Sequence, residues 1–158
     1  MGHNKDKQNI LKNKKMNLRI LLKEIGELAK EQKLVGFSAA GTSLDQINGM
    51  EIAWYPVLFN SPTGSHMVYQ NTTTYDITLY YLDRLLEDYS NDIDIYSSAI
   101  ENLKNIINGI KDIPGVVQVN DGYTIRNFTN TEKMNDRLAG AYAQVRIQVV
   151  NDTVCVDE

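Results

Sequence analysis

Two stretches of alternating polar and apolar residues dominate the chain. Mid-chain, from residue 68 to 81, β-branched and aromatic residues alternate with polar ones, which is typical of a half-buried strand. Residues 139–150 alternate in the same way. One face of the mid-chain strand is expected to carry Tyr69, Tyr75, Ile77, Leu79 and Tyr81. We predict that the two strands pair in one sheet with one covered face, while the other face is either wet or covered by something absent from this chain.

Two amphipathic helices are predicted beside these strands. Leucines and isoleucine recur at three- and four-residue spacing within residues 10–34. Gly26 lies inside this helix, where it costs about 1 kcal/mol relative to alanine and so indicates close approach by another element; Gly36 is expected to end the helix. A second helix is expected to start at Asn91 or Asp92, whose side chains can cap its free amides. Its predicted apolar stripe consists of Ile93, Tyr96, Ile100, Leu103, Ile106, Ile107 and Ile110.

The segment between the first helix and the long strand predicts a loop and then a strand. Residues 36–49 are rich in Gly, Ser, Ala and Asn, which favours a loop with one helical turn around residues 43–47. Residues 50–59 read as a strand that contains Pro56. Because proline donates no backbone hydrogen bond, we expect this strand at an edge or a bulge of the sheet.

The C-terminal third predicts a hairpin before the last strand. Residues 116–119 and 123–128 flank Asn120-Asp121-Gly122, a sequence suited to a tight turn. Gly140, at the start of the last strand, indicates a bulge or close backbone packing.

These elements together predict an α+β fold, with a single mostly antiparallel sheet of four to five strands and two main helices packed on one face. The expected domain covers residues 10–150, between a disordered polar tail at 1–9 and an acidic C-terminal tail at 151–158. A length of 158 residues suits one domain. Apolar and charged contents of 42% and 23% are those of a globular protein. No apolar run reaches the roughly 18 residues of a membrane helix, and the single cysteine fits a reducing compartment.

Charge is distributed unevenly along the chain. The first 33 residues contain nine Lys or Arg and four acids, whereas the other 125 contain seven and sixteen. Three interpretations stay open for this basic segment: it binds nucleic acid, it lies against the acidic body of a neighbouring copy, or it is a solvated tail. The residues that would form an electrostatic contact arm are Lys12, Lys14, Lys15 and Arg19.

Catalytic and metal-binding patterns are scarce, so we predict no enzyme, no metal and no cofactor. Only His3 and His66 could serve as imidazole ligands. Asp92 and its acidic neighbours flank a helix start, where acids are expected because of the helix dipole alone. Cys155 lies among acids, which raise the pKa of a thiol and make it a poor nucleophile.

Nine tyrosines are the other conspicuous feature of the composition. Tyrosine is enriched at protein interfaces, although tyrosines can equally cover a sheet with their hydroxyls in water. The acidic surroundings argue against a platform for stacking bases. The residues that we predict at a subunit interface are Tyr69, Tyr75, Tyr80, Gln144, Arg146 and Gln148.

Three stretches give the chain a resemblance to a known family: EIAWYPVLFNSP, TYDITLYYLDRLLEDYSNDIDIYSSAIENLKNIINGI and RLAGAYAQVRIQVV. The order of elements around them resembles that of the tail-terminator and head–tail joining proteins, or neck ring proteins, of tailed bacteriophages. The middle stretch is similar to the family's strand, polar turn and packed helix. The last stretch resembles its closing strand.

The resemblance implies a structural virion protein of the phage neck or tail, assembled in the cytoplasm of the bacterial host. Such a protein forms a homo-oligomeric ring, as a hexamer or dodecamer, that joins the capsid portal to the tail. Its partners would be other copies, portal, neck or tail proteins, and genomic DNA that passes without sequence-specific contact. No membrane is implied. The alternatives are a nucleic-acid-binding accessory protein that uses the basic N-terminal helix, and a small enzyme with an unrecognised carboxylate site.

Overall fold

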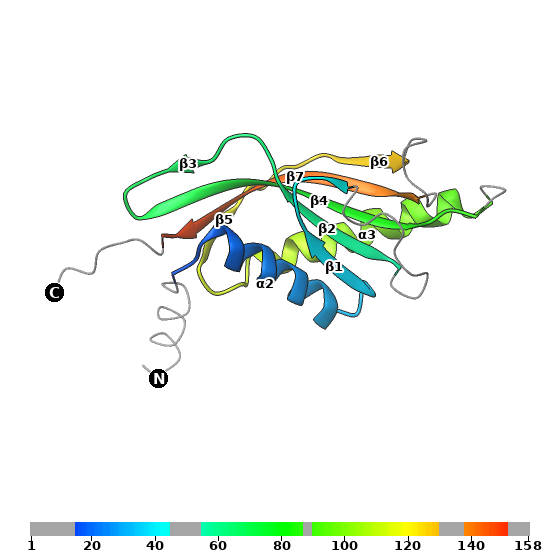
Figure 1. The fold of residues 1–158 in the computed structure, drawn as a ribbon, viewed down its shortest axis with the longest axis horizontal. Helices are drawn as coiled ribbons and strands as arrows, with labels where there is room; N and C mark the ends of the chain where they lie inside the picture. The colour runs from blue at the N-terminus through cyan, green and yellow to red at the C-terminus, as the bar shows by residue number, and fades with distance from the viewer. Residues whose placement is uncertain (1–14, 45–54, 87–89, 130–137, 152–158) are drawn as a thin grey trace.

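A computed structural model of the chain describes residues 15–44, 55–86, 90–129 and 138–151. These residues form an α+β fold with two helices and one mixed sheet of seven strands (Figure 1). The helices are α2 (Leu18–Glu31) and α3 (Asp92–Ile110). The strands are β1 (Phe37–Ala40), β2 (Val57–Pro62), β3 (Met67–Val68), β4 (Thr72–Arg84), β5 (Val116–Val119), β6 (Ile125–Thr129) and β7 (Leu138–Val150).

The long strands β4 and β7 pair with each other, as predicted, and they form the centre of the sheet. They pair antiparallel over their whole length, from Thr72 opposite Val150 to Arg84 opposite Leu138. The main path of the sheet runs β1-β2-β4-β7-β5, while β3 pairs with β4 and β6 pairs with β7. The prediction of four to five strands was too low, because β1 and β3 are too short to show an alternating pattern.

Both helices pack on the same face of this sheet, which confirms that part of the prediction (Figure 1). Between the layers lies one apolar core, to which each buried Leu or Ile contributes about 1.5–3 kcal/mol. Its aliphatic members from the helices and the two long strands include Leu21, Ile25, Leu103, Ile106, Ile107, Ile110, Ile77, Leu79, Val145, Ile147 and Val149.

Helix α2 is closed at both ends by local hydrogen bonds. The side chain of Asn17 accepts a hydrogen bond from the backbone N–H of Ile20 at 2.9 Å. At the C-terminal end, Lys33 adopts a left-handed conformation with φ of 58°, and the N–H of Leu34 reaches back to a carbonyl at 3.2 Å. The helix therefore ends before Gly36, and the prediction that Gly36 ends it was wrong.

Gly26 makes the close approach that its place in the sequence indicated. A Cβ atom at this position would lie 2.6 Å from the Oγ of Ser38, which belongs to β1. The strand β1 itself was not predicted, because its residues fall in the small-residue segment interpreted as a loop. It runs parallel to β2 and packs against α2. Most of the helical turn predicted at 43–47 lies outside the described residues.

Pro56 precedes strand β2 and does not interrupt it. The strand begins at Val57, and it lies between β1 and β4, so the prediction of an edge or a bulge was wrong. The proline needs no edge position, because it lies before the first ladder residue, where its missing N–H leaves no ladder bond unmade. Its carbonyl accepts a hydrogen bond from the N–H of Gly36 at 2.8 Å. Residues 50–54 of the predicted strand lie outside the described residues.

The predicted hairpin at Asn120-Asp121-Gly122 does not form. Strands β5 and β6 follow one another along the same edge of β7, and each pairs antiparallel with it. Asn120 bridges the gap, because its N–H donates to the carbonyl of Arg146 at 3.2 Å and its side-chain oxygen accepts from the N–H of Arg146 at 2.8 Å. The side chain of Asn120 thus continues the hydrogen-bond ladder with β7 at a position where the local sequence predicted a turn.

Helix α3 starts at Asp92, as predicted, but its first turn differs from the prediction in two respects. Asn91 occupies the position before the helix, but its side chain makes no capping bond. Ile95 faces the sheet and packs with Leu85 and Ala139, whereas Ile93 is 71% exposed. Two residues correspond to about 200° of rotation on a helix, so Ile93 points away when Ile95 points inwards. Ile93 therefore does not belong to the buried stripe.

Candidate assembly surfaces

The face of the sheet opposite the helices, here called the far face, divides along the β4–β7 ribbon into two halves. The core half comprises Ile77–Leu82 of β4 with its partners on β7, and the arm half comprises Thr72–Asp76 with residues 146–150. In the core half the far face is covered by the chain itself. Phe59, Leu82 and Leu138 are completely or almost completely buried there. The wet far face that the sequence predicted is therefore confined to the arm half and its border.

An aromatic cluster covers much of the core half. It consists of Phe59, Tyr80, Phe128 and Tyr142, and the rings of Tyr80 and Tyr142 stack with centroids 5.5 Å apart. Burial raises the pKa of Tyr80 above its usual value, and the neighbouring Tyr142 raises it further. Tyr80, which we predicted at a subunit interface, thus belongs mainly to this internal cluster.

The arm half presents a polar far face. Arg146 is 71% exposed, and its guanidinium forms an ion pair at 3.2 Å with Asp76, whose carboxylate is 12% exposed. Gln144 is exposed at the border with the core half, and Gln148 donates a hydrogen bond to Thr72 at 3.1 Å. The alternation of β7 therefore brings Gln144, Arg146 and Gln148 together on one face, as the sequence predicted.

Beyond this polar surface lies the tip patch, defined as Met67, Val68 and Tyr69. These residues are 56%, 73% and 53% exposed. The hydroxyl of Tyr69 donates to the sulfur of Met67 at 2.7 Å, and the N–H of Tyr69 donates to the carbonyl of Thr72 at 2.8 Å. Tyr69 was predicted within the long strand, but it lies in the turn between β3 and β4. The exposed apolar hairpin around it was not predicted.

Tyr75, another residue that was predicted at a subunit interface, lies on the opposite face of the sheet. Its side chain lies on the helix side of β4 and packs against the main core. The ring of His66 meets it edge-on, with centroids 5.3 Å apart. Because strand side chains alternate between faces, Tyr75 cannot share the far face with Arg146, so the residues predicted at a subunit interface do not form one surface.

Asn151 fixes the geometry of the hairpin tip. Its side chain donates to the carbonyl of Tyr69 at 3.0 Å and more weakly to that of Gln70 at 3.4 Å, and it accepts from the hydroxyl of Thr73. Its backbone N–H donates to the carbonyl of Asn71 at 3.0 Å. The sequence placed this residue in a frayed tail, yet it is only 8% exposed. The tip is therefore a structured turn.

Two further apolar side chains are exposed on either side of the start of α3. The start patch is defined as Leu86, 54% exposed, and Ile93, 71% exposed. The side chain of Asn91 accepts from the N–H of Leu86 at 2.8 Å and donates to the carbonyl of Arg84 at 3.1 Å. Sequence analysis missed this patch because the helical period of α3 includes Ile93 in the buried stripe.

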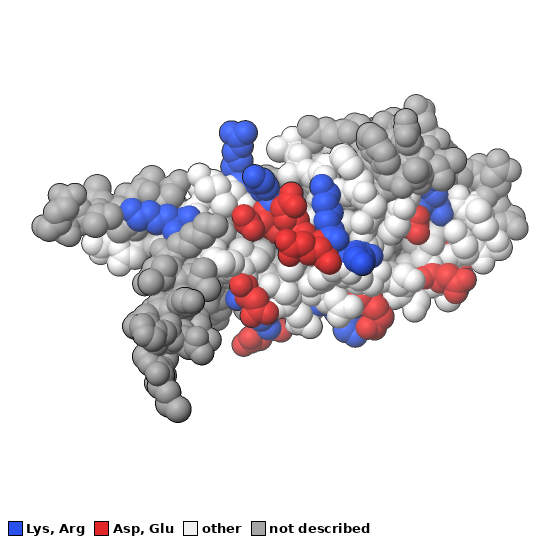
Figure 2. All heavy atoms as spheres, turned by 90° about the horizontal axis from the view of Figure 1, so that it is seen from below, with Lys and Arg blue, Asp and Glu red and all other residues white. Residues whose placement is uncertain are grey.

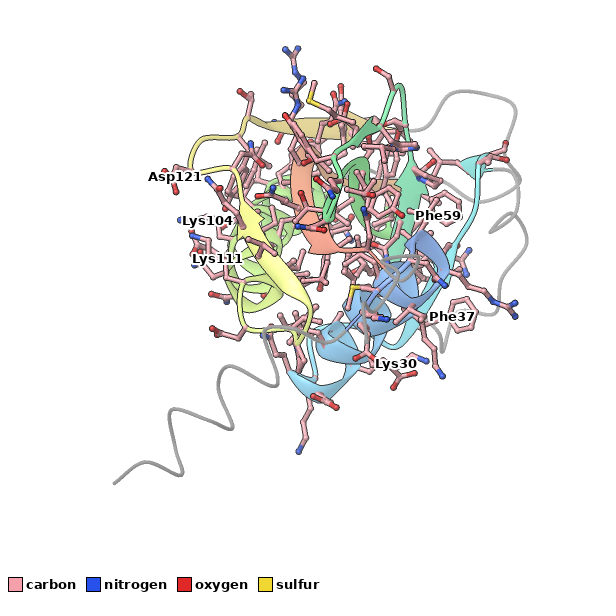
Figure 3. The ribbon with its side chains drawn as sticks, turned by 90° about the vertical axis from the view of Figure 1, so that its left-hand side faces the viewer. Lys30, Phe37, Phe59, Lys104, Lys111 and Asp121 are labelled. Atoms are coloured by element: carbon pink, nitrogen blue, oxygen red, sulfur yellow. The ribbon has the colours of Figure 1, made fainter. Side chains whose placement is uncertain are left out.

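The basic contact arm is only partly within the described residues. Lys12 and Lys14 lie outside them, whereas Lys15 and Arg19 are exposed. On the helix side, Figure 2 shows basic and acidic groups interleaved rather than gathered by sign. Figure 3 shows Lys30 on α2, Lys104 on α3 and Lys111 at the end of α3, all at the outside of the molecule. The described part of the helix layer is thus a mixed-charge surface.

A hollow of about 320 Å³ between the tip and the arm half brings together Ser65, His66, Asp76 and Arg146. Its geometry differs from that of a Ser-His-Asp triad. The Nδ1 of His66 accepts a hydrogen bond from the backbone N–H of Asp76 at 3.3 Å, whereas a triad histidine donates from this atom to a carboxylate. Asp76 is paired with Arg146 instead. Within the described ranges, there is also no group of three metal-ligating side chains.

Neither described helix has the length and hydrophobicity to cross a membrane. No protein-family model matches the chain, and no curated protein matches it significantly. The function is therefore inferred from the fold and from these surfaces.

Proposed function

We propose that the protein is a structural component of the neck or tail of a tailed bacteriophage. In this role it forms a homo-oligomeric ring, as a tail terminator or head–tail connector, that joins the capsid portal to the tail. The observation that carries the proposal is the arm half of the β4–β7 ribbon, whose polar far face and exposed tip patch lie beyond the buried core half. The order of the elements, which resembles that of neck ring proteins, supports the same role.

The arm half has the properties of a protein-binding surface. An interface combines an apolar centre rich in aromatic residues and methionine with a polar rim. The tip patch supplies Met67, Val68 and Tyr69, and the adjoining face supplies exposed polar groups such as Arg146 and Gln144. The hydrogen bonds of Asn151 hold the tip in one conformation, which lowers the entropy lost on binding.

The charge of the chain fits a channel for DNA. Residues 34–158 contain seven basic and sixteen acidic residues, a balance of −9. Such a body repels the phosphate backbone and lets DNA slide, whereas a basic lumen would bind it. Genomic DNA would then pass through the ring without sequence-specific contact.

Light scattering after size-exclusion chromatography, combined with negative-stain microscopy, tests the proposal. We expect ring-shaped particles with the mass of a hexamer or dodecamer. A protein that stays monomeric up to high concentration would contradict the proposal. If that monomer also bound DNA with a steep salt dependence, the nucleic-acid-binding alternative would replace it.

The Arg146→Glu variant tests whether ring assembly depends on the arm half. Arg146 is largely exposed on the far face, so the charge reversal is expected to reduce ring formation while leaving the fold intact. Lys104→Glu is the matched control, because Lys104 is also exposed but lies on α3 in the helix layer. Loss of thermal stability in Arg146→Glu together with normal assembly would show that the residue serves the fold alone.

A further inference from the structure

We infer that the tip patch of one copy contacts the start patch of the next copy, so that subunits join end to end. This inference rests on the proposed ring and names the surfaces that would build it. Both patches expose apolar side chains: Met67, Val68 and Tyr69 in the first, Leu86 and Ile93 in the second.

The two patches lie at opposite ends of the molecule. Figure 1 shows the β3–β4 turn at one end of the long axis and the start of α3 at the other. Val68 pairs with Thr73 near the beginning of β4, and Leu86 comes two residues after its end. The 13 residues of β4 span about 40 Å at ~3.3 Å per residue. One copy therefore cannot bring its own patches together.

Charge favours this pairing over a contact between like ends. Arg146 lines the same hollow as Met67 and Tyr69. It forms an ion pair with Asp76 at 3.2 Å, but its side chain is 71% exposed, whereas that of Asp76 is 12% exposed. Beside Ile93, the first turn of α3 carries Asp92 and Asp94, of which Asp94 is exposed. A contact between the tip and the start of α3 sets a cation against acids, whereas two tips would set Arg146 against Arg146.

Both patches are held in place before any contact is made. Asn151 bonds the carbonyls of the tip, and Asn91 bonds the backbone at Leu86 and Arg84. Five side chains are fewer than the 20–30 residues per side of a standard interface, so one such contact is weak. In a closed ring each copy makes the contact twice, once through its tip patch and once through its start patch. The contact that closes the ring forms within one particle, so the effective concentration of its two patches is high. The contact therefore favours a closed ring over an open pair.

Disulfide trapping tests the contact. Val68→Cys and Ile93→Cys are made separately in a Cys155→Ser background, which removes the only native thiol of the sequence. The two purified variants are mixed, allowed to exchange and oxidised mildly. We expect the mixed cross-link to form at least about tenfold faster than a cross-link between Val68→Cys and Lys104→Cys, because an assembled contact raises the effective thiol concentration.

The outcomes separate the contact from the ring. Rings with no excess of the mixed cross-link over the Lys104→Cys control would overturn the inferred contact and leave the proposed function standing. A specific cross-link in a particle with the mass of a dimer would support the contact and contradict the ring. Absence of both assembly and cross-link would contradict both.

A charge exchange gives a second measurement that leaves the apolar patches unchanged. Arg146→Glu is expected to slow the mixed cross-link when both partners carry it, and Asp94→Arg added to the same chains is expected to restore the rate. Failure of Asp94→Arg to restore the rate would show that Arg146 does not meet the start of α3.

Discussion

In the core half of the β4–β7 ribbon the backbone is covered on both faces, whereas the arm half is covered only on the helix side. Leu79 faces the helices and Leu82 faces the aromatic cluster, and both are completely buried. In the arm half the far face carries Arg146 and Gln148, and hydrogen bonds of Asn151 hold the end. The far face of the same pair of strands is thus stabilised by apolar burial at one end and by polar contacts at the other, while the helix side is buried along both halves. Only the second arrangement leaves a surface free for a neighbour.

Gly140→Ala in the core half is expected to give the largest effect. A Cβ at Gly140 would lie 1.8 Å from the carbonyl oxygen of Tyr81, so the two strands could not keep their spacing. We expect a loss of at least about 3 kcal/mol in the free energy of unfolding, measured with urea.

Gly122→Ala is the matched control for this substitution, because no heavy atom lies within 4 Å of the Cβ position at Gly122. It is expected to change stability by less than about 0.5 kcal/mol. Equal losses in the two variants would show that Gly140 is not required for close packing of β4 and β7.

Asn151→Ala tests whether amide bonding holds the arm half. The substitution leaves the carbonyl of Tyr69 without its side-chain donor and the hydroxyl of Thr73 without its acceptor. We expect a loss of about 2 kcal/mol, with hydrogen exchange accelerated at the amide of Tyr69 and unchanged at core amides. A uniform acceleration over the whole sheet would mean that the two halves are not stabilised separately.

The phenolic oxygen can be removed from the core half with Tyr81→Phe and from the tip patch with Tyr69→Phe. The hydroxyl of Tyr81 donates to the carbonyl of Leu34 at 2.8 Å and accepts from Asn102 at 2.9 Å in the interior. Its removal is expected to lower stability by about 1–2 kcal/mol, because buried partners lose their bonds. Tyr69 is 53% exposed, so its variant is expected to change stability by less than about 0.5 kcal/mol. Thermal unfolding of the two variants measures both losses of stability. A larger loss for Tyr69→Phe than for Tyr81→Phe would contradict this expectation.

Apart from the control variants, the smallest effect is expected for Asp83→Asn, near the end of β4. Burial raises the pKa of the Asp83 carboxyl above its ordinary value of 3.8, although the N–H of Arg84 donates to it and partly opposes the shift. A raised pKa in the folded state means that the ionised form destabilises the fold above that pKa, and that this penalty disappears as pH falls below 3.8. The neutral amide introduced by Asp83→Asn would avoid the penalty while keeping the acceptor oxygen.

The variant is therefore expected to be more stable than the parent chain at pH 7, by less than about 1 kcal/mol because the group is partly solvated. Urea unfolding from pH 7 to pH 3 should show this difference shrinking towards zero. A difference that grows as the solution becomes more acidic would show that the carboxylate stabilises this end of the ribbon.

The sequence by itself determined the elements whose pattern is long. The alternation of β4 and β7, the apolar spacing of α2 and most of α3, and the close approaches at Gly26 and Gly140 follow from local periodicity and residue size. The grouping of Gln144, Arg146 and Gln148 on one face follows from the same alternation.

Only the tertiary structure decided which surfaces are covered. Whether Ile93 is buried depends on how α3 rotates against Leu85 and Ala139, and whether Asn120 makes a turn depends on the edge that β7 offers. The free end of the ribbon depends on Asn151, whose partners lie about 80 residues earlier in the chain. Such contacts join residues that are distant in sequence. A local pattern cannot predict them, because burial and hydrogen bonding depend on how the whole chain packs.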